Sequence, residues 1–318
     1  MINTGKFKYL LRPAMLSMTF VLGIGFQMWS KLSWKTHDGN SISLWLIRCS
    51  LMIMFYLVLL KIDFSKLIPR REHFTILAAN LAMGIVPYAV LKYLGYDTLA
   101  LAAFFAGITP TANAAPVVMD FLEGNVEFVL AGFVITNFFI DIALVGLLPW
   151  VTGNFNCSFL LDVAGQIALV VVFPLVCAAS TKFICRRLNK KVFKTPGMVT
   201  FTIWCGSLFV ISAQSTLFFQ QHREVSMNSV LLISLLSFII CALNFTAGKF
   251  AGAGNFRREA AQTLGQKNTT LTIFLALTFG TPESALGPTF YVLWHNLWNA
   301  CQMYRHDLNK TATLKEKK

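Results

Sequence analysis

The sequence predicts an all-α polytopic membrane protein with ten transmembrane helices. The 318 residues are 56% hydrophobic and only 13% charged, and a soluble domain carries about twice that charged fraction. The apolar residues also fall in blocks close to the roughly 20 residues that a helix needs to cross the hydrocarbon core of a membrane. The ten blocks are residues 13–30, 43–60, 74–91, 98–121, 127–150, 159–181, 198–219, 228–248, 260–279 and 284–304.

The net charge of +13 is arranged as in a membrane protein rather than as in a nucleic-acid-binding protein. With ten spans, the loops on the side opposite the two termini hold only Lys31, Lys35, Lys92 and Arg223. Nearly all other Lys and Arg residues fall on the side of the termini, which the positive-inside rule makes cytoplasmic. A basic face for nucleic acid would not alternate in this way. We therefore expect a multi-pass protein of a bacterial inner membrane, with the lipid bilayer and not nucleic acid as its partner.

Ten spans divide into two halves of five, residues 1–152 and 153–308, followed by a basic cytoplasmic tail, 309–318. An odd number of spans per half places the halves in opposite orientations, which is the inverted-repeat design of many secondary transporters. We find no cleavage site after the first apolar block, so it is predicted to stay as a span.

Both halves carry a polar interruption in their fourth span. Non-helical backbone at membrane depth is tolerated where it is buried in protein or lines a cavity. We therefore expect spans 4 and 9 to be broken helices that cross, touch near the bilayer midplane and form a substrate site; the alternative is a pair of proline kinks whose exposed backbone groups are covered by neighbouring helices. The candidate residues are Thr109, Pro110, Thr111, Asn113 and Pro116 in the first break, and Thr263, Gln266, Lys267 and Asn268 in the second.

Two charged residues inside spans are candidates for a coupling charge. A charge within the membrane is costly and defaults to a functional hypothesis. The Lys267 ammonium could supply a fixed or exchangeable positive charge at the second break, or it could snorkel to the membrane surface. Asp141, with Asn137 one turn before it, is its natural counter-charge, although Asp141 could equally belong to a local network.

Three further polar residues within spans have open roles. His295 and Asn296 in the last span are predicted either to contact substrate or to form hydrogen bonds between helices. Arg48 in the second span could snorkel outward or touch substrate. The seven cysteines show no metal-ligand spacing, so they are interpreted as small apolar residues.

The two breaks and the last span resemble the bile acid:sodium symporter family. The segment from Pro110 to Val126 is similar to the family's first break, and "LGQKN" (264–268) with "TPESALGPTFYVLWHNL" (281–297) is similar to its second break and last helix. This resemblance implies ten helices in a panel and a core subdomain, with two helices crossing at the transport site. It also implies an organic anion as substrate, typically coupled to sodium.

The residues depart from the family's pattern where sodium is bound. By analogy with other hard cations, sodium needs about six oxygen ligands. The family's ligand positions fall here on residues that mostly lack a suitable oxygen: Thr111-Ala112, Ala115-Pro116, Val129, Phe133, Thr263 and Lys267. These departures from the family's pattern predict transport without a sodium cofactor, either independent of sodium or coupled to protons.

The predicted function is secondary active transport (a symporter) of a small organic anion by alternating access. A non-transporting membrane sensor on the same fold is the main alternative. Arsenite-type metalloid efflux is a second alternative, but residues 107–120 contain no cysteine. We do not expect an enzyme, because no intramembrane Ser/His/Asp set, H-E-x-x-H motif or carboxylate pair is present. The identity of the anion and the oligomeric state are left open by the sequence.

Overall fold

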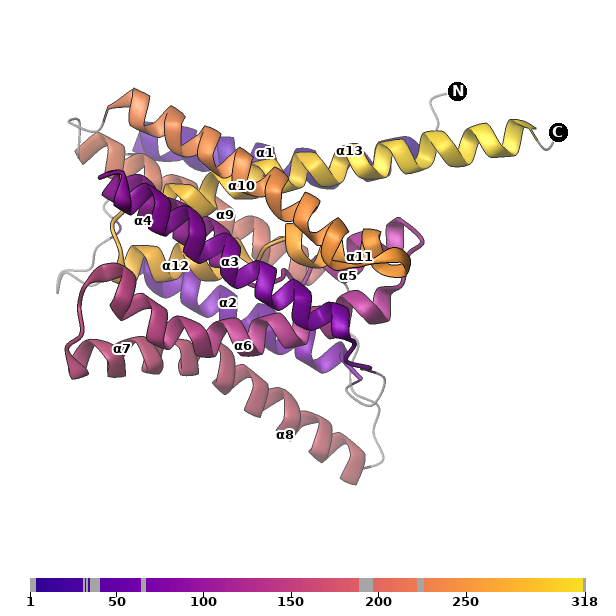
Figure 1. Ribbon diagram of the computed structural model, residues 1–318, viewed down its shortest axis with the longest axis horizontal. Helices are drawn as coiled ribbons and strands as arrows, with labels where there is room; N and C mark the ends of the chain where they lie inside the picture. Colours follow the sequence, from indigo (N-terminus) through magenta and orange to yellow (C-terminus); the bar gives the residue numbers. More distant parts are fainter. Residues whose placement is uncertain are drawn as a thin grey trace.

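A computed structural model describes residues 4–30, 32, 34, 41–63, 67–188, 197–221 and 226–316. The described chain is a bundle of α-helices without a β-strand (Figure 1). An isolated β-bridge joins Thr111 to Lys267. The first half contains α1 (Thr4–Ser30), α2 (Ile42–Lys61), α3 (Arg71–Tyr93), α4 (Asp97–Ile108), α5 (Ala115–Phe121) and α6 (Val126–Thr152).

The second half begins with a long helix in three parts: α7 (Cys157–Ile167), the π-helical turn η2 (Ala168–Val172) and α8 (Phe173–Arg187). It continues with α9 (Gly197–Gln221), α10 (Met227–Ala251), the 3₁₀ turn η3 (Gly254–Phe256), α11 (Arg257–Gly265), α12 (Thr269–Phe279) and α13 (Leu286–Glu316). Residues 309–316, predicted as part of a tail, continue α13 as helix.

Every predicted span coincides with one helix or with consecutive helices. Among the described residues, five helices are long and apolar enough to cross a membrane, namely α2, α3, α6, α7–α8 and α10. Spans 4 and 9 are each broken in two, and the pieces α4 and α12 are apolar helices too short to be counted with these five. The described part of the chain is therefore all-helical, with the long apolar helices of an integral membrane protein.

Glycines allow several of these helices to touch along their backbones. A Cβ atom added to Gly107 of α4 would lie 1.9 Å from the Met83 carbonyl oxygen of α3, and one added to Gly287 of α13 would lie 2.2 Å from the Ala102 carbonyl oxygen of α4. Small residues at such crossings are typical of membrane helices, whose association depends on close van der Waals packing. This packing holds α4 firmly against α3 and α13.

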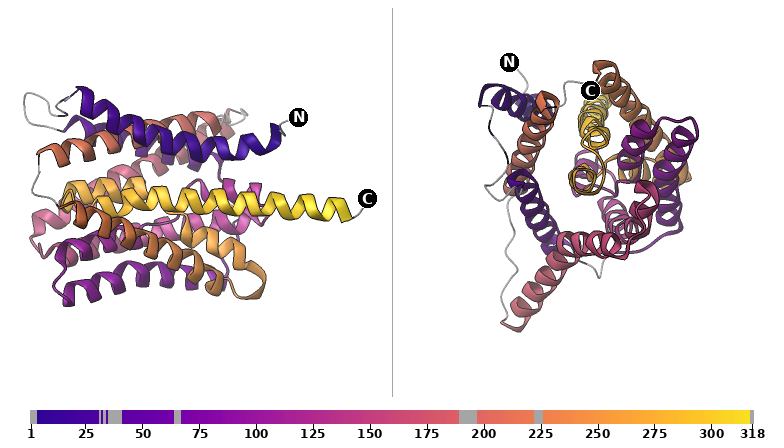
Figure 2. Two further views of the ribbon diagram at one scale, coloured as in Figure 1. Left: turned by 90° about the horizontal axis from the view of Figure 1, so that it is seen from above. Right: turned by 90° about the vertical axis from the view of Figure 1, so that its left-hand side faces the viewer.

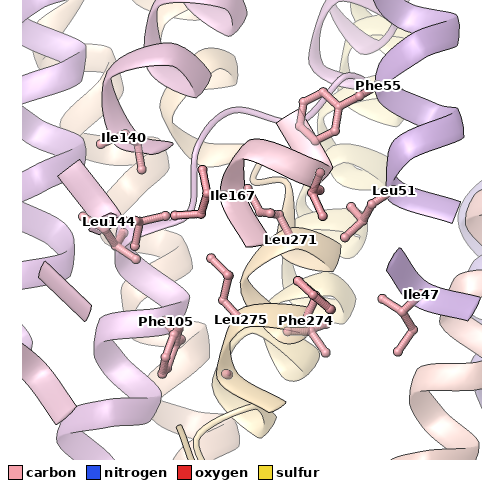
Figure 3. Close-up of a cluster of buried hydrophobic side chains, with 14 of the residues drawn as sticks. Ile47, Leu51, Phe55, Phe105, Ile140, Leu144, Ile167, Leu271, Phe274 and Leu275 are labelled. Atoms are coloured by element: carbon pink, nitrogen blue, oxygen red, sulfur yellow. The ribbon is translucent and has the colours of Figure 1, made fainter. Parts of the chain in front are cut away.

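The helices form two groups. In the end-on view of Figure 2, α1 and α9 lie side by side with α2 and α8 next to them, α3, α4 and α10 lie on the other side, and α13 lies between, in contact with α10 and α4. A large apolar cluster joins the two groups. Figure 3 shows Ile47 and Leu51 of α2 facing Leu271 and Phe274 of α12, with Ile167 of α7 close by.

The basic helix ends gather at one end of the bundle. The start of α1, the end of α8, the turn between α10 and α11 and the end of α13 lie together there, as Figures 1 and 2 show. The opposite end carries the turn between α3 and α4, with an exposed ion pair of 2.8 Å between Lys92 and Asp97. This arrangement agrees with the charge pattern that predicts cytoplasmic termini.

The orientation predicts which engineered cysteines react with a membrane-impermeant thiol reagent. In a background without native cysteines, Lys190→Cys in the basic 182–194 loop should stay unlabelled in intact cells, whereas Lys92→Cys at the opposite end should label readily. Lys190 lies outside the described residues, so Lys92 is the better-placed probe. Labelling at position 190 but not at position 92 would show that the protein has the opposite orientation in the membrane.

Candidate functional site

The two helix breaks meet through their backbones. The first break is residues 109–114, between α4 and α5, and the second is residues 266–268, between α11 and α12. The Ala112 amide donates to the Gln266 carbonyl at 2.8 Å, and the Asn268 amide donates to the Pro110 carbonyl at 2.8 Å. The predicted contact between the breaks is thus confirmed. We call these two paired segments the crossing.

Two of the residues predicted in the breaks lie just outside them. Pro116 is in the first turn of α5, where its missing N–H costs no helical hydrogen bond. Thr263 is in the last turns of α11, and its hydroxyl donates to the Glu259 carbonyl at 2.8 Å. The non-helical segments are therefore shorter than the sequence suggested.

Three of the last four carbonyls of α4 accept hydrogen bonds from side chains. The final four carbonyls of a helix have no partner within the helix, and in lipid an unsatisfied one is costly. The Phe105 carbonyl accepts from the Thr109 hydroxyl at 2.6 Å, the Gly107 carbonyl accepts from Lys267 Nζ at 3.2 Å, and the Ile108 carbonyl accepts from Asn80 Nδ2 at 3.0 Å. Each cap comes from the crossing or from α3.

The end of α11 is closed in the same way. The Thr263 carbonyl accepts from the Thr111 hydroxyl at 2.7 Å, and the Gly265 carbonyl accepts from the Tyr291 hydroxyl of α13 at 2.8 Å. The negative ends of two helix dipoles, each equivalent to roughly half an elementary charge, therefore meet at the crossing.

Lys267 supplies the positive charge at this point. Its side chain is 1% exposed, and its ammonium donates to Asn80 Oδ1 as well as to the Gly107 carbonyl. A cation at the C-terminal end of a helix is favourable, most of all where water is excluded. The buried ammonium is thus held by the end of α4 and by the Asn80 side chain of α3 rather than by a carboxylate, and it does not snorkel.

A hydroxyl and amide network fixes the first break against its neighbours. Thr136 Oγ1 of α6 donates to Thr111 Oγ1 at 2.8 Å, and Asn137 Nδ2 donates to the Thr111 carbonyl at 2.9 Å. The hydroxyls of Thr109 and Thr272 are hydrogen-bonded to each other at 2.8 Å. The first break is consequently held by α6 and α12 as well as by the second break.

Asp141 does not pair with Lys267. Asp141 is buried in α6, and neither of its carboxylate oxygens has a hydrogen-bond partner within the described part of the chain. The Oδ1 atom of Asn137, one turn earlier, is also without a partner. The expected counter-charge pairing is therefore wrong, because Asn80 and the end of α4 take the ammonium instead.

The two predicted site residues on α13, His295 and Asn296, differ in their hydrogen bonding. His295 is buried with no partner for either ring nitrogen among the residues described, and its ring meets that of Tyr291 edge-on with centroids 5.6 Å apart. Tyr291 in turn caps the end of α11, which links His295 to the crossing. The Asn296 amide donates within its own helix, to the Val292 carbonyl at 2.8 Å. Asn113 is partly buried in the first break.

Sequence reasoning missed four residues that build the crossing. Asn80, Thr136, Thr272 and Tyr291 each donate or accept a hydrogen bond there. Asn80 could have been found, because an amide in the middle of an apolar span is rare and usually functional.

No group of three His, Cys, Asp or Glu side chains that could hold a metal ion occurs in the described part of the chain. Val129 and Phe133, two positions where the family resemblance implies sodium ligands, are buried in apolar clusters.

No protein-family model matches the chain, and no curated protein matches it.

Proposed function

We propose that the chain is a secondary transporter of small organic anions, related to the bile acid:sodium symporters and working by alternating access without sodium. The observation that carries this proposal is the crossing, in which two broken helices pair their backbones around a buried ammonium. Broken helices of this kind form the substrate and ion sites of many secondary transporters. The half-helices α5 and α12 also begin there, and helix N-termini favour anions.

The packing of helices supports an inverted repeat of residues 1–152 and 153–308. In the first half α3 packs on α4, and in the second half α10 packs on α11. Contacts between the halves are exchanged in the same way: α1 packs on α9 as α8 packs on α2, and α13 packs on α4 as α11 packs on α6. These pairs are what a twofold relation between spans 1–5 and spans 6–10 requires.

The two groups of helices suggest how access alternates. We assign α1, α2, α8 and α9 to a panel and the helices around the crossing to a core. The contact between α2 and α12 is apolar, so a sliding motion there would break few hydrogen bonds. Movement of the core against the panel would expose the crossing first on one side of the membrane and then on the other.

Transport is best tested by uptake into proteoliposomes containing the purified protein. A set of radiolabelled carboxylates is tested, with proton and potassium gradients imposed separately. At least one of them should accumulate to a higher level in the proteoliposomes than in liposomes without protein. Saturable binding without any uptake would favour the sensor alternative. Binding and uptake both absent for every carboxylate would overturn the proposal.

Uptake by the wild-type protein is predicted to be the same in sodium, potassium and choline media at fixed pH. Lys267 places a positive charge at the end of α4, where a coupling cation would otherwise bind. Two like charges about 4 Å apart at an effective dielectric of about 20 repel by about 4 kcal/mol, or roughly a thousandfold in affinity. Initial uptake rates over a range of sodium concentrations provide the measurement. A steep, saturable dependence on sodium would contradict the prediction.

A further inference from the structure

Lys267 is placed so that it cannot hold the negative group of a substrate. Its side chain is 1% exposed, and its ammonium is already bound to Asn80 and to the end of α4. An anionic substrate, which the proposed function requires, must then meet a different cation. Besides Lys267, the basic residue within a predicted span is Arg48.

Arg48 lies where the panel meets the core. It is on α2, next to Ile47, and its guanidinium carbon is 5.4 Å from the centre of the Phe274 ring on α12. Figure 3 shows Ile47 and Phe274 facing each other across this interface. At 1.5 Å per residue, Arg48 is about 9 Å inside the start of α2, and Phe274 is about 8 Å beyond the start of α12 at the crossing. The guanidinium therefore lies between the crossing and the end of the bundle opposite the termini.

The guanidinium has no anionic partner. No carboxylate of the described residues lies within ion-pair distance of Arg48, and its buried Nε atom lacks a hydrogen-bond acceptor. A charge in an apolar interface is costly unless it is paired or hydrogen-bonded. The contact with the Phe274 ring compensates only in part, whereas a carboxylate would supply acceptors for the guanidinium N–H groups.

We propose that Arg48 binds the carboxylate of the transported anion at the panel–core interface. The fork of N–H donors matches a carboxylate with two parallel hydrogen bonds, which a lysine ammonium cannot reproduce. Lys267 then holds the crossing together, and Arg48 selects the substrate. This inference rests on the proposed function, since it names the group that recognises the anion.

The test compares carboxylates with their neutral amides. Hexanoate, benzoate and cholate, each paired with its primary amide, are measured for binding to the purified full-length protein and for uptake by proteoliposomes. Arg48→Gln should weaken carboxylate binding by about tenfold to a hundredfold, as expected for hydrogen bonds to a charged group. Amide binding should change little, and Arg48→Lys should recover only part of the affinity. The matched control is Arg187→Gln, because Arg187 is exposed and stacks on Phe183 at 5.0 Å.

Thermal stability separates recognition from a structural role. Without ligand, Arg48→Gln should melt at or above the wild-type temperature, because it removes an unpaired charge from an apolar interface. A lower melting temperature with equal losses for carboxylates and amides would make Arg48 structural and overturn the inference. If Arg48→Gln still bound carboxylates in preference to their amides as strongly as the wild type does, the inference would be overturned, but the proposed transport function would not. A wild type that neither binds nor moves any of the three carboxylates would overturn both.

Discussion

Lys267→Gln is expected to reduce anion uptake by at least thirtyfold while leaving the fold intact. The glutamine amide can still donate to Asn80 Oδ1 or to the Gly107 carbonyl, which accept from the Lys267 ammonium, so the variant removes the charge and keeps a hydrogen bond. Even about 8 Å from a carboxylate, a unit charge at an effective dielectric of about 20 contributes about 2 kcal/mol, which is roughly thirtyfold in affinity. Initial uptake rates in sodium-free medium provide the measurement.

The matched control for this variant is Lys92→Gln. Lys92 pairs with Asp97 at 2.8 Å in an exposed turn, where an ion pair contributes little, so uptake should be unchanged. Lys267→Arg should retain binding, because the charge remains, but should lose any proton coupling because a guanidinium does not release its proton. Wild-type uptake by Lys267→Gln would show that the ammonium serves packing alone.

Gly107→Ala is expected to destabilise the protein strongly, by about 1–3 kcal/mol or more. The added Cβ would lie 1.9 Å from the Met83 carbonyl oxygen and 2.6 Å from the Met83 carbonyl carbon. Backbone atoms of α3 cannot move aside as a flexible side chain could, so α4 must shift. Because Gly107 also supplies a carbonyl to Lys267, the shift should disturb the crossing as well. The melting temperature of the purified protein measures the first effect, and uptake measures the second.

Gly146→Ala is the matched control for Gly107→Ala. Gly146 is also helical, but it is exposed on α6 and an added Cβ there would meet no atom within 4 Å. Alanine is the better helix former by about 1 kcal/mol in water, so this variant should be as stable as the wild type or slightly more stable. Equal melting temperatures for the two variants would mean that α3 and α4 do not pack as closely as described.

The sequence predicted the helices and the meeting of the two breaks because both depend on local signals. Apolar blocks of membrane length specify helices, and matched polar interruptions in corresponding spans indicate a shared site. The edges of the breaks were less predictable. Proline is compatible with the first turn of a helix, so Pro116 did not extend the first break into α5.

The partners of individual side chains could not be predicted from the sequence in the same way. Asp141 was expected opposite Lys267 because opposite charges attract, yet a helix-end carbonyl and an amide oxygen also accept from an ammonium, and here Gly107 and Asn80 hold it. Asn80 bridges the ammonium and the Ile108 carbonyl, a role that depends on how α3 packs on α4. Such a role becomes visible only when the helices are placed in space.

The pairing of the two breaks sets a condition on biosynthesis. The Thr111 hydroxyl caps a carbonyl of Thr263, 152 residues further along the chain, and the Gly107 carbonyl receives its ammonium from 160 residues away. At roughly 5–20 residues per second, a ribosome needs about 8–30 s to make that stretch. During this interval the first five spans are already synthesised, yet the broken fourth span has carbonyls without donors, which lipid cannot satisfy. These carbonyls of the first half must therefore be in contact with water, the insertion machinery or a chaperone until the ninth span (α11 and α12) has been synthesised and inserted.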